Sequence, residues 1–252
     1  MTELATLPTT HDEDWRYADP AALDALTPEG LDVWHEVTLA AGETRSKDLI
    51  LDDAHPGIHR VRMVLGEGAR AEIYAIASAD AYTRLEIEVR LGKGAHFEFG
   101  GVTIGGGDVT REFVTRVTHA APDATSNQTV RAVHWGRATG NFLGRLEVAR
   151  DAQKTDAAQN FKAILLEKGA AANAKPELEI FADDVKCAHG AAIGALDQAA
   201  AFYMAARGIP PEAARKLLIR AFVADAFHTL GDAEQRDALL EQALAGLGEE
   251  LA

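Results

Sequence analysis

Several features that are common in proteins are scarce or missing in this chain. It has one cysteine in 252 residues, so it cannot build an internal disulfide framework, which fits a reducing compartment. No apolar run approaches the ~18 residues of a membrane span, and the N-terminus lacks the basic start and apolar stretch of a signal peptide. Lys and Arg number 25 against 39 Asp and Glu, and the resulting net charge of −14 argues against nucleic acid or an anionic membrane as a partner. We therefore expect a cytoplasmic protein with no nucleic-acid and no membrane partner.

Familiar catalytic patterns are absent as well. Neither the Gly-x-Ser-x-Gly nucleophile elbow nor the His-Glu-x-x-His zinc pattern occurs. The glycine triplet at 105–107 stands between two expected strands and not before a helix, so it does not indicate a phosphate-binding loop. His55 and His59 have the spacing of a helical ligand pair, but Pro56 and Gly57 between them exclude a helix.

The first half of the chain contains a repeat. Similar segments recur every 26 residues and begin at Leu39, Leu65, Leu91 and Val117. One position of the repeat holds glycine in three copies and alanine in the fourth: Gly42, Gly68, Gly94 and Ala120. A period in the twenties is typical of a solenoid, in which each coil buries its apolar face against the next coil.

Segments of alternating apolar and polar residues lie between these turns, which indicates strands. They are residues 58–65, 82–91, 95–99 and 110–117. Equivalent strands of successive coils would pair in parallel, about 4.8 Å apart. We therefore expect a mainly β fold, a right-handed parallel β-helix over residues 31–195. An antiparallel sandwich is the alternative, although it does not require a fixed 26-residue period.

Both ends of the chain differ from this core. Residues 1–30 are polar and predict an extended or short-helical N-terminal arm. Residues 196–252 predict a helical region, with Asp197 as a helix N-cap and Gly208 after the first helix. Phe202 and Tyr203 form an apolar side of that helix, which we expect in the core of the bundle. A second helix is predicted from Pro210-Pro211 to Gly231, and a third over 233–247.

The stretch from Pro176 to Gly208 holds the chain's most distinctive chemistry. Cys187 and His189 are two residues apart in an expected strand, so sulfur and imidazole point to the same face. Both groups are good ligands for iron or zinc, but a closed site usually needs about four ligands. The alternative is a small buried thiol and a hydrogen-bonded strand histidine.

The order of motifs in this region resembles the SufB/SufD family of iron–sulfur cluster assembly proteins, and its SufD branch most closely. The matching pieces are PELEI, ADDVKCAHGA, IGALD, FYMAARGI and EAARKLLIRAF, about fifty residues in order. The segment Glu13-Asp14-Trp15-Arg16-Tyr17 is similar to one found ahead of the SufD core. Longer relatives have a helical domain near here that this chain is too short to hold. SufB proteins carry a functional cysteine just before this signature, whereas residues 160–175 contain none, which favours SufD.

The resemblance implies both a site and partners. It implies that His189 acts as a metal ligand at an interface with a SufB-like subunit, where a transient iron–sulfur cluster forms without being stably bound. Cys187 is then a second ligand or a packing residue. It also implies that a SufC-like ABC ATPase docks on the helical region, where Arg220, Phe222 and Phe227 are the expected contacts.

These observations predict a SufD-like scaffold subunit that is not itself an enzyme. Two alternatives stay open. One is a homodimeric β-helical interaction protein with no role in cluster assembly. The other is an enzyme that uses Cys187 and His189 as nucleophile and base, although no third residue is evident to orient such a pair.

Overall fold

The computed structural model describes residues 7–247, and the strands among them form a stack of coils. The odd-numbered strands are β1 (His35–Leu39), β3 (Gly57–Leu65), β5 (Thr83–Leu91), β7 (Thr110–His119), β9 (Thr139–Val148) and β11 (Ala171–Ile180). The even-numbered strands are β2 (Thr44–Leu51), β4 (Arg70–Ala77), β6 (His96–Gly105), β8 (Thr125–His134), β10 (Asp156–Leu165) and β12 (Lys186–Gly194).

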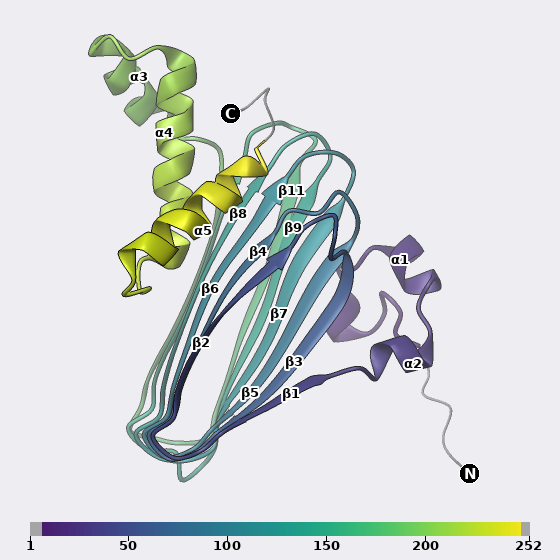
Figure 1. The fold of residues 1–252 in the computed structure, drawn as a ribbon, viewed down its shortest axis with the longest axis vertical. Helices are drawn as coiled ribbons and strands as arrows, with labels where there is room; N and C mark the ends of the chain where they lie inside the picture. Colours follow the sequence, from purple (N-terminus) through teal and green to yellow (C-terminus); the bar gives the residue numbers. More distant parts are fainter. Residues whose placement is uncertain (1–6, 248–252) are drawn as a thin grey trace.

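Each coil gives one strand to each of two sheets (Figure 1). Sheet A has the order β1-β3-β5-β7-β9-β11, and sheet B has the order β12-β10-β8-β6-β4-β2. Neighbouring strands in both sheets are parallel, as in the pairs β3 with β5 and β10 with β12. The prediction of a mainly β, parallel β-solenoid followed by a helical region is confirmed, and the antiparallel sandwich is wrong.

The 26-residue period holds only in the first coils. Leu39 pairs with Leu65 and Leu65 with Leu91, as the repeat predicts. Leu91 then pairs with His119, two residues beyond the expected Val117. The prediction that Ala120 replaces the corner glycine is therefore wrong.

Asp123 is the residue that takes the fourth corner. Its φ is 61°, and its N–H donates to a carbonyl of the next coil as the corner glycines do. Lys154 has a φ of 64° in the fifth coil. Since a left-handed conformation is unfavourable for side chains larger than glycine, these two corners were hard to recognise in the sequence.

The two sheets enclose an apolar interior. Inward-facing residues alternate along the strands and are almost fully buried in the middle coils, and they include aromatic pairs that meet inside the stack. Phe99 and Phe113 meet edge to face with ring centroids 5.4 Å apart, and Phe142 stacks on Phe161 at 5.9 Å. Burial of this kind is the main stabilising term of the fold.

Two histidines are buried within the same stack. His119 lies 2.9 Å from the hydroxyl of Ser126, and burial lowers its pKa to about 4. His134 donates from Nδ1 to the Gly105 carbonyl and accepts at Nε2 from the Thr103 hydroxyl, both at 3.0 Å. Burial lowers its pKa to about 3, so both rings are neutral near pH 7.

Three helices follow the solenoid, and the last two cover the outer face of sheet B (Figure 1). They are α3 (Gln198–Ala206), α4 (Pro211–Ala224) and α5 (Ala233–Ala245), with a 3₁₀ turn over Asp225–Phe227. The second helix therefore ends before the expected Gly231. Ile219, Val223 and Phe227 pack on Tyr74 and Ile76 of sheet B. No helix in the described part of the chain is both long and apolar enough to cross a membrane.

The N-terminal arm packs on the outer face of sheet A. It forms a 3₁₀ turn at Glu13–Trp15 and the short helices α1 (Pro20–Asp24) and α2 (Pro28–Leu31). The guanidinium of fully buried Arg84 lies 3.7 Å from the centre of the Trp15 ring and donates to the Asp14 carbonyl. Arg84 also pairs with Glu86 and Glu112, so the arm and sheet share one buried ionic network.

Candidate functional site

Cys187 and His189 lie on β12, the edge strand of sheet B in the last coil. Cys187 pairs in register with Ala157, and His189 with Gln159. Ala157 and Gln159 are buried inside the solenoid, so their neighbours on β12 point to the same inner side. The next inward position of β12, Ala191, is exposed, as His189 is, because no further coil covers it in the described structure. The structure therefore places both predicted ligands at the open end of the stack.

Cys187 is the more enclosed of the two. It is half-buried and packs against the apolar core beside Val148 and Ala152. Burial raises the pKa of its thiol, and the negative charge of Asp156 raises it further. The free chain therefore holds Cys187 as a thiol, which disfavours its use as a nucleophile.

The donor set at this end is small. Among the described residues, no three His, Cys, Asp or Glu side chains gather closely enough to hold a metal ion. Cys187 and His189 supply two donors of the kinds that iron accepts. This part of the chain therefore carries at most half of an ordinary cluster site.

The end of the solenoid around these residues is apolar. β11 and β12 each have one hydrogen-bonded neighbour in the described structure, so each leaves a free edge. Exposed large apolar side chains lie along this coil at Ile180, Phe181 and Ile193. An open edge with apolar side chains is suited to pairing with another β structure.

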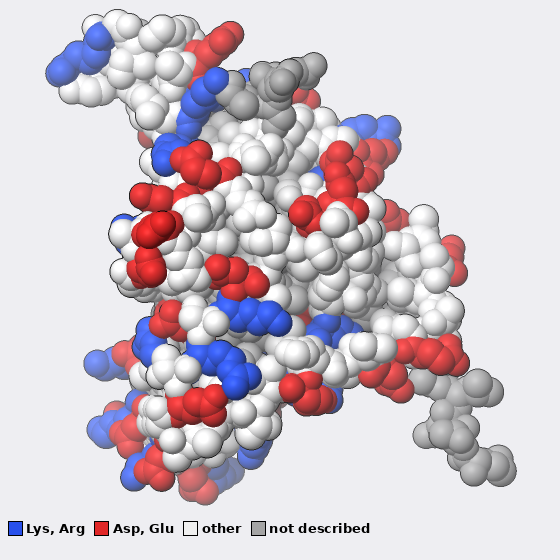
Figure 2. All heavy atoms as spheres, in the orientation of Figure 1, with Lys and Arg blue, Asp and Glu red and all other residues white. Residues whose placement is uncertain are grey.

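A second exposed surface lies on the helical hairpin of α3 and α4. Asp197 caps α3 by accepting from the N–H groups of Ala199 and Ala200, which confirms it as an N-cap. None of the residues of α3 is buried, and Phe202 is 77% exposed. Our expectation that Phe202 and Tyr203 belong to the bundle core is therefore wrong. In Figure 1, α3 projects away from both sheets, and in Figure 2 this projection is mostly uncharged with Lys or Arg at its outer tip.

The three residues expected to contact an ATPase have different environments. Arg220 is half-exposed and pairs with Glu241 at 2.5 Å. Phe222 is half-buried, and the Arg131 guanidinium lies 5.9 Å from its ring centre. Phe227 is fully buried, with its ring 6.3 Å from that of Tyr74, which corrects its expected place on the surface. Phe227 instead attaches the helices to sheet B.

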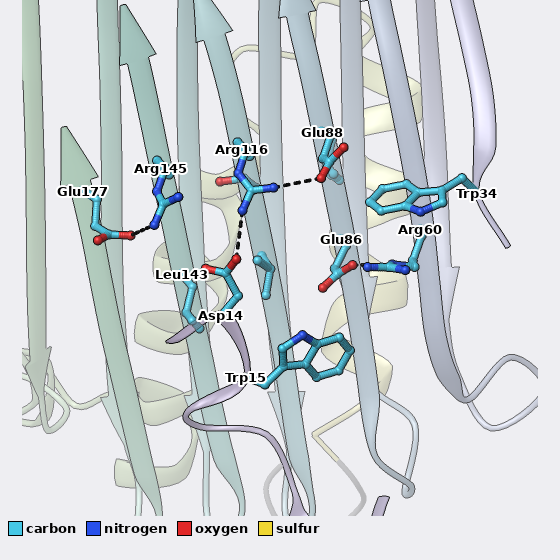
Figure 3. Close-up of a pocket in the computed structure, with 13 residues that line it drawn as sticks. Asp14, Trp15, Trp34, Arg60, Glu86, Glu88, Arg116, Leu143, Arg145 and Glu177 are labelled. Carbon is cyan, nitrogen blue, oxygen red and sulfur yellow. Dashed lines mark hydrogen bonds and ion pairs between the residues drawn. The ribbon is translucent and has the colours of Figure 1, made fainter. Parts of the chain in front are cut away.

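A charged groove on the outer face of sheet A lies between the arm and Trp34 (Figure 3). Arg116 donates to Asp14 at 2.8 Å and to Glu88 at 2.9 Å, and Arg145 donates to Glu177 at 3.3 Å. Each labelled carboxylate in the groove already has a cationic partner. We interpret the groove as the surface on which the N-terminal arm packs, because every charged side chain described in its lining already has a partner of opposite charge.

The fold and its last coil define the class of protein: a β-solenoid with a cysteine and a histidine at an open end and a helical hairpin beside them. Residues 51–222 match the family model described as "SUF system FeS cluster assembly, SufBD core domain", and the chain belongs to this family. Within it, the chain is most like the SufD branch.

Three relatives show this likeness. Iron-sulfur cluster assembly protein SufD of Escherichia coli is 41% identical over 116 residues, which is 46% of this chain and 26% of that protein. Protein ABCI7, chloroplastic, of Arabidopsis thaliana is 46% identical over 96 residues, 38% of this chain and 20% of the relative. Iron-sulfur cluster assembly protein SufD of Bacillus subtilis is 30% identical over 139 residues, which is 55% of this chain and 32% of that protein. The chain thus aligns with about a third or less of each of these relatives.

Proposed function

We propose that this chain is a scaffold subunit of SUF-type iron–sulfur cluster assembly and not itself an enzyme. Its last coil would pair with a SufB-like solenoid, and its helical hairpin would bind a SufC-like ABC ATPase. The observation that carries the proposal is the open apolar end of the stack, where β11 and β12 each leave an edge free beside His189. Membership of the SufBD family supports the same reading.

The cluster in this proposal is transient cargo. His189 supplies an imidazole from this chain, and Cys187 supplies a thiol that becomes a ligand only when a metal or a partner's charge lowers its pKa. The SufB-like partner completes the donor set, since clusters normally take about four protein ligands. The site is therefore shared, and the chain alone binds no cluster stably.

The first test removes the imidazole. We expect His189→Ala to lower the yield of cluster in reconstitution with SufB-like and SufC-like partners, with an unchanged unfolding midpoint. The matched control is His35→Ala, an exposed histidine on the edge strand β1 at the opposite end of the stack. A wild-type yield from His189→Ala would refute the assigned role.

The second test concerns the ATPase. Exposed aromatic rings on α3, with Arg207 stacked 4.7 Å from the Tyr203 ring centre, support α3 as a contact surface, with Arg220 and Phe222 at the neighbouring α4. We expect the double variant Phe202→Ser and Tyr203→Ser to lose binding to the ATPase in a pull-down. Val33→Ser, which also replaces an exposed apolar residue but before β1, should retain it. Binding that survives in the double variant would move the contact off α3.

The open edge also suits a second copy of this chain, which keeps the homodimer as an alternative. Analytical ultracentrifugation of the chain alone and with a SufB-like partner separates the two. A homodimer that the partner does not dissociate would favour the alternative.

A further inference from the structure

The inner position occupied by His189 belongs to a column of side chains that runs through the solenoid. In register along sheet B, this column consists of Lys47, Ile73, Phe99, Gln128, Gln159 and His189. It is apolar in the second and third coils and polar in the last three. Burying amides inside an apolar stack costs stability unless each group has a hydrogen-bond partner.

Gln159 is the unusual member of the column. It is only 2% exposed, and neither its Oε1 nor its Nε2 has a hydrogen-bond partner in the described structure. Gln128 differs at one atom: its Oε1 accepts from the Thr115 hydroxyl at 2.6 Å, although its Nε2 has no partner in the described structure either. A buried amide with both polar atoms unpaired is destabilising, so the position of Gln159 in the interior calls for an explanation.

The interior is shaped to admit this amide. The residue opposite it on sheet A is Gly144, and a Cβ built there would lie 2.7 Å from Gln159 Nε2. Any side chain at position 144 would therefore crowd the amide. The facing strand of the last coil carries Ala174 and Leu178 toward the core, and neither side chain can hydrogen-bond to the histidine.

The neighbour of Gln159 on the other side is His189. The two are register partners on adjacent parallel strands, about 4.8 Å apart along the column, and their side chains lie on the same inner face. That spacing brings a glutamine amide within reach of an imidazole on the next strand. A neutral imidazole binds metal through one nitrogen, and the hydrogen bond made by the other nitrogen decides which one that is.

We propose that Gln159 is a positioning residue for His189. The described structure has no hydrogen bond between the two side chains, but a change of rotamer would let Gln159 Oε1 accept the N–H of one ring nitrogen of His189 and leave the other nitrogen unprotonated and free to bind iron. The binding of iron rests on the proposed function above, but the hydrogen bond would form between two residues of this chain. It therefore needs no partner to be observed.

The experiment measures the tautomer of the ring. The full chain, labelled with ¹⁵N-histidine, is studied by two-dimensional NMR at pH 8, and the His189 signals are identified by their loss in His189→Ala. We expect wild-type His189 to show one dominant tautomer. Gln159→Leu, which keeps a side chain of similar size, should shift both ring nitrogens toward the mixture seen for an unstructured histidine.

Gln128→Leu is the matched control. It makes the same change one coil deeper, next to Gln159 but not next to His189, and should leave the His189 signals unchanged. If Gln159→Leu does not fold, nuclear Overhauser contacts between the Gln159 amide protons and the His189 ring protons in the wild-type chain decide the question. Unchanged ring shifts in Gln159→Leu, or an amide in contact with water alone, would overturn the proposal.

Failure of this proposal differs from failure of the proposed function. In one outcome, Gln159 fixes the tautomer of His189, but His189→Ala still assembles clusters normally. The hydrogen bond would then be real but would have no role in cluster assembly. The converse result, an essential His189 with an unchanged tautomer in Gln159→Leu, would remove only the role of Gln159.

Discussion

Mild acid should destabilise this protein through two buried histidines. His119 and His134 are fully buried, and their pKa values are lowered to about 4 and about 3, against about 6.5 in an unfolded chain. Between these values the unfolded chain binds protons that the folded chain does not, so unfolding becomes easier as the pH falls. Their contribution to stability is complete above about pH 6.5 and is lost as the pH falls toward the folded-state values.

The expected size follows from these pKa values. At pH 5 an unfolded histidine is almost fully charged while each buried ring is still neutral, which costs about 2 kcal/mol per histidine. The free energy of unfolding should therefore drop by about 4 kcal/mol between pH 7.5 and pH 5. Urea titrations at a series of pH values, followed by circular dichroism, measure this directly.

Two variants test whether the pH dependence of stability comes from these two histidines. His119→Gln places an amide near the position of the ring Nε2 that meets Ser126, and His134→Asn retains a donor toward the Gly105 carbonyl. Each should lose about half of the pH dependence, whatever it does to stability at neutral pH. A wild-type loss below about 1 kcal/mol, or a double variant with the full dependence, would refute the argument.

Three further predictions concern the arm and the helices. Arg84→Met should cost about 3–5 kcal/mol in thermal unfolding, because it leaves Glu112 buried without a cation, whereas Glu86 keeps Arg60; a loss below about 1 kcal/mol would contradict this. Phe227→Ala should cost about 3–5 kcal/mol in urea titration, whereas exposed Phe202→Ala should change stability by less than about 0.5 kcal/mol, and equal effects would be inconsistent with their burial. Asp197→Ala should cost α3 about 1 kcal/mol, seen as faster amide exchange in that helix alone.

The solenoid could be predicted because the residues at equivalent positions of successive coils recur in the sequence with a fixed period. The leucines at 39, 65 and 91 occupy equivalent positions, and the glycine corners that follow them need a conformation that few other residues adopt. Where the coil lengthens by two residues, the period no longer locates the corner, and Asp123 carries no glycine signal. Periodicity therefore predicts the architecture but not the register of the later coils.

The helical region was predicted less well, for a geometric reason. The second helix was expected to continue to Gly231, and Phe227 was expected to be partly exposed. α4 instead ends at Ala224 and a 3₁₀ turn follows, but Phe227, four residues after Val223 and eight after Ile219, still lies on the face that packs on sheet B. Conversely, Phe202 looked like a core residue because apolar spacing does not show whether a second surface is present to cover it.

The candidate site was found from Cys187 and His189, but its inner neighbour was not. Gln159 has no motif around it, and its link to His189 is a 30-residue register that follows from the length of one particular coil. Such a pairing becomes visible only once the strands are aligned in space.

The one-dimensional stacking of the coils has a thermodynamic consequence. Each coil contacts only its immediate neighbours, so the free energy needed to open a coil locally depends on how many neighbours it has. The last coil has one neighbour in the described structure, and it carries His189. We expect the amides of β12 to exchange with solvent faster than those of β8 or β10. A partner that binds this edge would act as an additional nearest neighbour, so that the strand bearing the histidine would become fully ordered only in the complex.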